Sequence, residues 1–175
     1  SSDVVVAGNF ILDDAVQVDG GNRLVEASGN LTITGGTTGL FSTKGQTNSL
    51  ALKAGSTLLV GSSTAFSAGS GNLVQNATLE GGIVTLGSAN AILAGNLVAT
   101  SVAGALTFSG QVVTGGSVSL QSDSPISLQA ITTGAVAGLG FSQTGAGAVT
   151  LRDSLTTSGG SISFDSNITL STAIA

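Results

Sequence analysis

The chain has 175 residues, of which 7% are charged and 41% hydrophobic, with a formal net charge of −5. It contains no His, Cys, Trp or Tyr, which excludes catalysis by histidine or cysteine, metal sites built on those residues and Trp or Tyr stacking platforms. Nine acidic residues against four basic ones leave no basic footprint for DNA or RNA, and no apolar run reaches the roughly 20 residues of a membrane-spanning helix.

The mean hydropathy of +0.50 is too high for a disordered chain, although 27 residues are glycine. We therefore expect a folded domain with many short strands and tight turns, and no secondary structure based on helices.

Residues 1–27 differ from the rest of the chain, because they hold five of the nine acidic residues and show no clear strand spacing. We expect a divergent acidic N-terminal cap or first rung, since charge protects the exposed edge of a sheet. The adjacent pair Asp13-Asp14, with Asp19 five residues later, supplies the candidates for a calcium or glycosidic site. A solvated cap is the favoured interpretation of these three residues.

From residue 28 to residue 175, triplets of apolar, small polar and apolar residues recur in three interleaved series at intervals near 22 residues. The first series is Leu50, Leu73, Leu97, Val118, Leu139 and Ile162. The second is Leu58, Val84, Leu106, Ile126, Val149 and Ile168, and the third is Ile92, Val112, Ile131, Leu155 and Ile174.

Three strands per period indicate a chain wound into a three-sided coil. We predict an all-β parallel β-helix (a β-solenoid) of about 7–8 rungs, where a rung is one winding of roughly 22 residues. Alternation directs the apolar side chains of each triplet into the lumen and the Ser or Thr outward. A β-sandwich is the alternative architecture, but repeated corner motifs such as Gly115-Gly116 and Gly159-Gly160 favour the solenoid.

Two alternatives to a purely structural role rest on particular residues. A carbohydrate-active or carbohydrate-binding β-helix would use carboxylates and loop pairs such as Arg152-Asp153, although a surface ion pair is the simpler interpretation. An ice-binding protein would need an outer threonine ladder, for which Thr114, Thr132-Thr133 and Thr156-Thr157 are the candidates. Neither alternative requires a cofactor, and we expect none.

The last strands carry no charge after Asp165. We expect an open sheet edge there, formed by Ile168, Leu170, Thr172 and Ile174, that pairs end to end with another copy. Such a contact is heterologous and produces filaments when it does not close.

The motifs Gly-Asn-Leu-Thr-Ile-Thr (29–34), Gly-Gly-Ser-Val-Ser-Leu (115–120) and Ser-Asn-Ile-Thr-Leu-Ser (166–171) resemble repeats of bacterial filamentous-haemagglutinin-like exoproteins and autotransporter passengers. The resemblance implies a right-handed parallel β-helix, secreted or at the cell surface, that serves as a structural or adhesive element without catalysis. We expect host or surface glycans as partners. The absence of methionine indicates a processed mature protein or an excised segment, which fits secretion.

Overall fold

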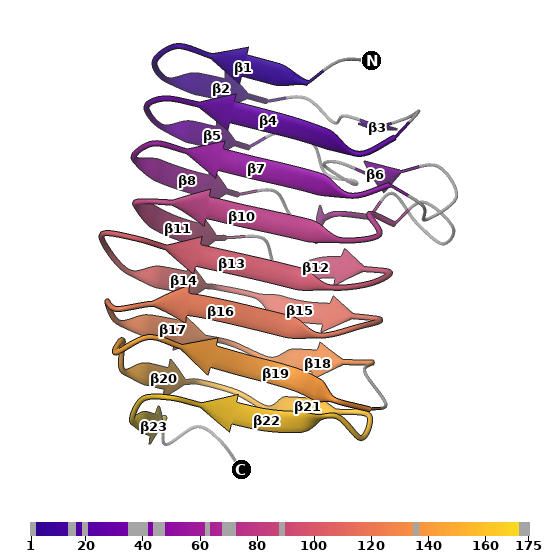
Figure 1. Cartoon of the computed structure of the whole chain (residues 1–175), viewed down its shortest axis with the longest axis vertical. Coiled ribbons are helices and arrows are strands. Elements are labelled where there is room, and N and C mark those ends of the chain that lie inside the picture. Colours follow the sequence, from indigo (N-terminus) through magenta and orange to yellow (C-terminus); the bar gives the residue numbers. More distant parts are fainter. Residues whose placement is uncertain are drawn as a thin grey trace.

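The computed structural model describes residues 3–13, 17–18, 21–34, 42–43, 48–61, 64–67, 73–87, 90–134 and 137–171. All regular secondary structure in these residues is β-strand. The strands stack as a ladder along the long axis of the molecule, and the two chain ends lie at opposite ends of it (Figure 1). The predicted three-sided parallel β-solenoid is therefore confirmed, with about 21 residues per rung.

Two eight-stranded sheets and one five-stranded sheet form the three sides, and every neighbouring pair of their strands is parallel. Sheet 1 contains β1 (Val4–Val6), β4 (Arg23–Ala27), β7 (Leu50–Ala54), β10 (Ala77–Gly81), β13 (Leu97–Ser101), β16 (Val118–Ser122), β19 (Leu139–Thr144) and β22 (Ser161–Phe164). Sheet 2 contains β2 (Phe10–Leu12), β5 (Leu31–Ile33), β8 (Thr57–Val60), β11 (Ile83–Leu86), β14 (Leu106–Phe108), β17 (Ile126–Leu128), β20 (Val149–Leu151) and β23 (Ile168–Leu170). Sheet 3 contains β9 (Thr64–Ala65), β12 (Asn90–Leu93), β15 (Gln111–Thr114), β18 (Ile131–Thr133) and β21 (Leu155–Thr157), and a separate pair is formed by β3 (Gln17–Val18) and β6 (Ser42–Thr43).

The apolar residues of each triplet face the lumen, as the alternation predicts. In β14, for example, Leu106 and Phe108 are buried and Thr107 between them is partly exposed. Each lumen residue stacks on the equivalent residue of the next rung, about 4.8 Å away. The result is one continuous apolar core that is shared by all rungs.

The second predicted series matches the register of sheet 2 at every position, from Leu58 to Ile168. The first series is wrong at two positions. Ala77, not Leu73, pairs with Leu50 and Leu97, and Phe141, not Leu139, pairs with Val118 because a bulge separates Leu139 from Phe141.

The third series is displaced by one residue at its start. Ala91, not Ile92, pairs with Val112, so that Ala91 is buried and Ile92 lies on the outer side of β12. A shift of one residue reverses the face of every side chain in a strand. Val112, Ile131 and Leu155 pair as predicted, and Ile174 lies outside the described residues.

Asparagine side chains hold the corner that precedes sheet 1. The amide oxygen of Asn76 accepts from the N–H of Asn96 at 2.8 Å, and the amide oxygen of Asn96 accepts from the N–H of Ser117 at 2.8 Å. Asn22 accepts in the same way from the N–H of Ser49 at 2.9 Å. Each bond joins one rung to the next and satisfies a corner N–H that has left the sheet ladder.

Glycines are required at corners for two different physical reasons. Gly159 has a φ of 132°, in the region that favours glycine. At Gly115 the reason is close approach, because an added Cβ would overlap the backbone carbonyl of Ala94 one rung away.

Residues 4–12 continue the solenoid, since β1 pairs with β4 and β2 pairs with β5. The N-terminal segment therefore contributes the terminal strands of sheets 1 and 2.

Candidate functional site

The predicted acidic site receives no support from the part of the chain that the structure describes. Asp13 is exposed and follows β2, while Asp14 and Asp19 lie outside the described residues. Within the described ranges, no three acidic side chains gather in a way that could hold a metal ion.

The C-terminal face of the rod consists of β22 and β23, the last strands of sheets 1 and 2. Ile162, Ile168 and Leu170 are 46%, 43% and 62% exposed there. All three occupy lumen positions, because they pair with Phe141, Val149 and Leu151, which are buried. Of the predicted edge residues, Ile168 and Leu170 thus lie on an exposed apolar face, and Thr172 and Ile174 fall outside the described residues.

The N-terminal face mirrors this arrangement. Val4 occupies a lumen position of sheet 1 and is 40% exposed. Phe10 and Leu12 occupy lumen positions of sheet 2 and pack against the core while remaining partly exposed. Both ends of the rod therefore present side chains whose equivalents inside the rod are covered by a neighbouring rung.

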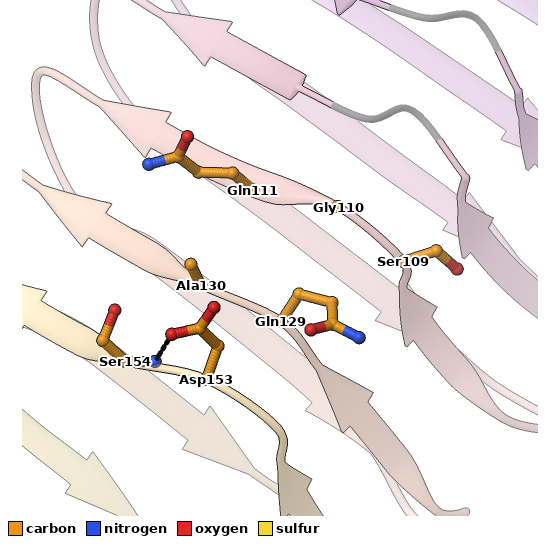
Figure 2. A pocket seen from close by; sticks show the side chains of 7 residues that line it. All are labelled: Ser109, Gly110, Gln111, Gln129, Ala130, Asp153 and Ser154. Atoms are coloured by element: carbon orange, nitrogen blue, oxygen red, sulfur yellow. Dashed lines mark hydrogen bonds between the residues drawn. The ribbon is translucent and has the colours of Figure 1, made fainter. Parts of the chain in front are cut away.

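A shallow polar groove follows the corner between sheets 2 and 3 (Figure 2). Three successive rungs contribute to it, through the segments that join a strand of sheet 2 to a strand of sheet 3 and through Gln111, the first residue of β15. Its volume is about 400 Å³, and its lining residues are Ser109, Gly110, Gln111, Gln129, Ala130, Asp153 and Ser154.

Arg152 and Asp153 bond to different partners and do not act as the simple surface pair that the sequence favoured. The Arg152 Nε donates to the Ser127 hydroxyl at 3.0 Å, and the Asp153 carboxylate accepts from the N–H of Ser154 at 2.6 Å. Asp153 therefore belongs to the groove, whereas Arg152 reaches back over sheet 2.

The outer face of sheet 1 carries a column of alternating charge that the sequence analysis missed. Glu26 pairs in register with Lys53, and Lys53 with Glu80. The Lys53 Nζ lies 3.1 Å from the Glu80 carboxylate. The equal spacing of these three residues along the chain was the available signal.

Of the threonines considered for an ice-binding ladder, Thr114 and Thr133 are buried in the lumen, so these two do not belong to an outer face. The Thr114 hydroxyl donates to the carbonyl of Gly116 at 3.0 Å, and the Thr133 hydroxyl has no hydrogen-bond partner. Outward hydroxyls instead form a column on sheet 2, consisting of Thr85, Thr107, Ser127, Thr150 and Thr169.

In the described residues no helix is long and apolar enough to cross a membrane. Comparison with known protein families, with curated proteins and with solved structures finds no match for this chain.

Proposed function

We propose that this chain is a non-catalytic structural element of an extracellular filament or cell-surface adhesin, and that it joins copies end to end. The observation that carries the proposal is the exposure of lumen side chains at both ends of the rod. Its resemblance to filamentous-haemagglutinin-like repeats supports the surface location and the adhesive role.

The apolar columns of the two ends are complementary in register. Following sheet 1 from strand to strand, Val4 belongs to the same column as Phe164. Following sheet 2, Phe10 belongs to the same column as Ile168. A second copy that continues the ladder would therefore place β1 on β22 and β2 on β23, with apolar residues on both sides of the contact.

The contact satisfies two needs at once. It covers the exposed lumen residues, which is favourable by about 25 cal/mol for each Å² of apolar surface removed from water. It also gives the unpaired backbone N–H and C=O groups of the terminal strands new partners by strand addition. Because the two surfaces differ, the contact does not close on itself and leads to a filament.

Sedimentation velocity and electron microscopy over a range of concentrations test this proposal. The natural chain should form rods that lengthen with concentration, and the double variant Ile168→Lys/Leu170→Lys should remain monomeric. Val102→Lys is the matched control, since Val102 is an exposed apolar residue at a corner on the side of the rod. Natural protein that stays monomeric at the highest soluble concentration, or a double variant that still assembles, would overturn the proposal.

A mixing experiment tests the polarity of the contact. Val4→Lys blocks the N-terminal face and Ile168→Lys/Leu170→Lys blocks the C-terminal face, so each variant alone should be monomeric. The mixture should form one-to-one dimers and nothing longer. A symmetric contact would instead leave dimers in at least one unmixed variant.

The surface location has its own test. Protease added to intact cells of the natural source should degrade the chain, and full protection of the chain would contradict this part of the proposal.

A further inference from the structure

The groove at the corner between sheets 2 and 3 is built from equivalent positions of three rungs. Ser109 and Gly110 connect β14 to β15, which begins at Gln111. Residues 129–130 connect β17 to β18, and Asp153 and Ser154 lie in the connection from β20 to β21. Rungs lie about 4.8 Å apart. Gln111, Ala130 and Ser154 each directly precede one of the paired residues Val112, Ile131 and Leu155, so the positions that line the groove, though not the residue types, repeat along the axis of the rod (Figure 2).

Backbone hydrogen bonds fix this corner from rung to rung. The N–H of Val112 donates to the carbonyl of Ala130, and the N–H of Ile131 donates to the carbonyl of Ser154, both at 2.9 Å. The bond from the N–H of Ser154 holds the Asp153 carboxylate in place. A groove that is already ordered loses little entropy when a ligand enters it.

The side chains in the groove provide both hydrogen-bond donors and hydrogen-bond acceptors. Amide groups of Gln111 and Gln129 each donate and accept, the Asp153 carboxylate accepts, and the hydroxyls of Ser109 and Ser154 do both. Figure 2 shows one hydrogen bond between these lining residues, the one from Ser154 to Asp153, so the two amides are not used within the groove.

The same residues define which chemistry the groove disfavours. Its lining has one charged side chain, Asp153, which repels anionic ligands, and Ala130 is its only apolar side chain. A ligand rich in neutral hydroxyl groups matches this combination of amides, a carboxylate and hydroxyls. We propose that this groove binds a neutral oligosaccharide lying along the rod axis.

The groove holds the sugar without cleaving it. Glycoside hydrolysis generally uses two carboxyl groups on either side of the scissile bond, and the groove lining provides only that of Asp153. The role of the site is therefore attachment to a glycan, with Gln111, Gln129 and Asp153 as the main contacts.

Isothermal titration and backbone NMR with a panel of neutral hexasaccharides test the proposal. The panel consists of cellohexaose, xylohexaose, mannohexaose and maltohexaose, with hexagalacturonate as the acidic comparison. We expect at least one neutral member to bind and to shift the amide resonances of Gly110, Gln111 and Ala130. Loss of one hydrogen-bonding side chain is worth about 0.5–1.5 kcal/mol, so Gln111→Ala and Gln129→Ala should each weaken binding about 2- to 10-fold.

Two matched controls separate the groove from the rest of the surface. Gln121→Ala removes an exposed amide on sheet 1, and Asp13→Asn removes an exposed carboxylate beyond β2. Neither should change the affinity, whereas Asp153→Asn should reduce it. The proposal is overturned if no neutral member binds at millimolar concentration, if only hexagalacturonate binds, or if the groove variants bind as tightly as the controls.

This test is independent of filament formation. The end-blocked variant Ile168→Lys/Leu170→Lys should bind the sugar with unchanged affinity, because its substitutions lie outside the groove. If that variant stays monomeric and still binds, both proposals stand, and each can fail without the other.

Discussion

The middle of the rod and its C-terminal end are made of the same kind of residue in the same column, yet they differ in burial. Ile126 in β17 is 1% exposed and Ile168 in β23 is 43% exposed. Both occupy the lumen position of sheet 2. The difference shows that a rung is not covered by its own residues, because the covering side chains come from the rungs on either side.

The comparison can be tested by truncating the isoleucine in the middle of the rod and the isoleucine at its C-terminal end. Ile126→Ala should lower the free energy of unfolding by about 2–5 kcal/mol, because it leaves a cavity between two rungs. Ile168→Ala should cost less than about 1 kcal/mol, since that side chain is already in contact with water. Urea unfolding of dilute protein, followed by circular dichroism, measures both, and equal losses would contradict the argument.

The corner glycines test whether the rungs are packed as closely as the structure indicates. Gly115→Ala should destabilise the protein by roughly 1–3 kcal/mol, because the new methyl group would overlap the carbonyl of Ala94. Gly61→Ala is the control, since a methyl group there has ordinary contact distances. Its thermal midpoint should match the natural chain or exceed it. A tolerated Gly115→Ala would show that neighbouring rungs can separate at this corner.

A buried polar group near the C-terminal end sharpens the comparison further. The Gln143 amide donates to the carbonyls of Thr144 and Gly145 at 3.0 Å, and accepts from the Ser166 hydroxyl at 3.0 Å. Gln143→Leu should cost about 1–2 kcal/mol, because it leaves two partly buried carbonyls without these partners.

Hydrogen exchange locates that effect. Amides of residues 161–171 should exchange faster in Gln143→Leu, while those of β13 and β16 should be unchanged. Gln121→Leu, at an exposed position of β16, is the control, and it should leave the amide exchange rates of both regions unchanged. Uniform acceleration along the chain would mean that the last rung is not held by this contact.

The smallest effect is expected on the outer face of the rod. Lys53→Ala should cost less than about 1 kcal/mol, because both partners of the Lys53–Glu80 pair are substantially exposed. The loss should shrink between 0.1 M and 1 M salt, since the Debye length falls from about 10 Å to about 3 Å. Stability that does not depend on salt in the natural chain would indicate that the pair contributes nothing.

The sequence predicts the fold well because large aliphatic residues mark most lumen positions, and most strands of sheet 2 have the regular triplet. It fails where a small residue takes a lumen position. Ala77 and Ala91 are small and only weakly hydrophobic, so the sequence analysis assigned the lumen positions to the larger nearby residues Leu73 and Ile92 instead. The bond from the N–H of Asn96 to the Asn76 side chain marks the true register, because Asn76 precedes Ala77 as Asn96 precedes Leu97.

The candidate sites are less visible in the sequence than the fold. Ile168 and Leu170 were predictable because they follow the same triplet pattern as the buried strands. The groove was not, since Gln111, Gln129 and Asp153 come together only when three corners of different length are stacked. The spacing of residues along the chain does not reveal the strand registers that bring these side chains to one corner.

The direction of the hydrogen bonds has a mechanical consequence. Bonds between rungs run along the rod, so tension applied to its two ends loads successive rungs in series and should release them one at a time from an end. A released rung of about 21 residues adds roughly 70 Å of extended chain. We therefore expect stretching in an optical trap to give a series of small extension steps of similar size, one for each rung released.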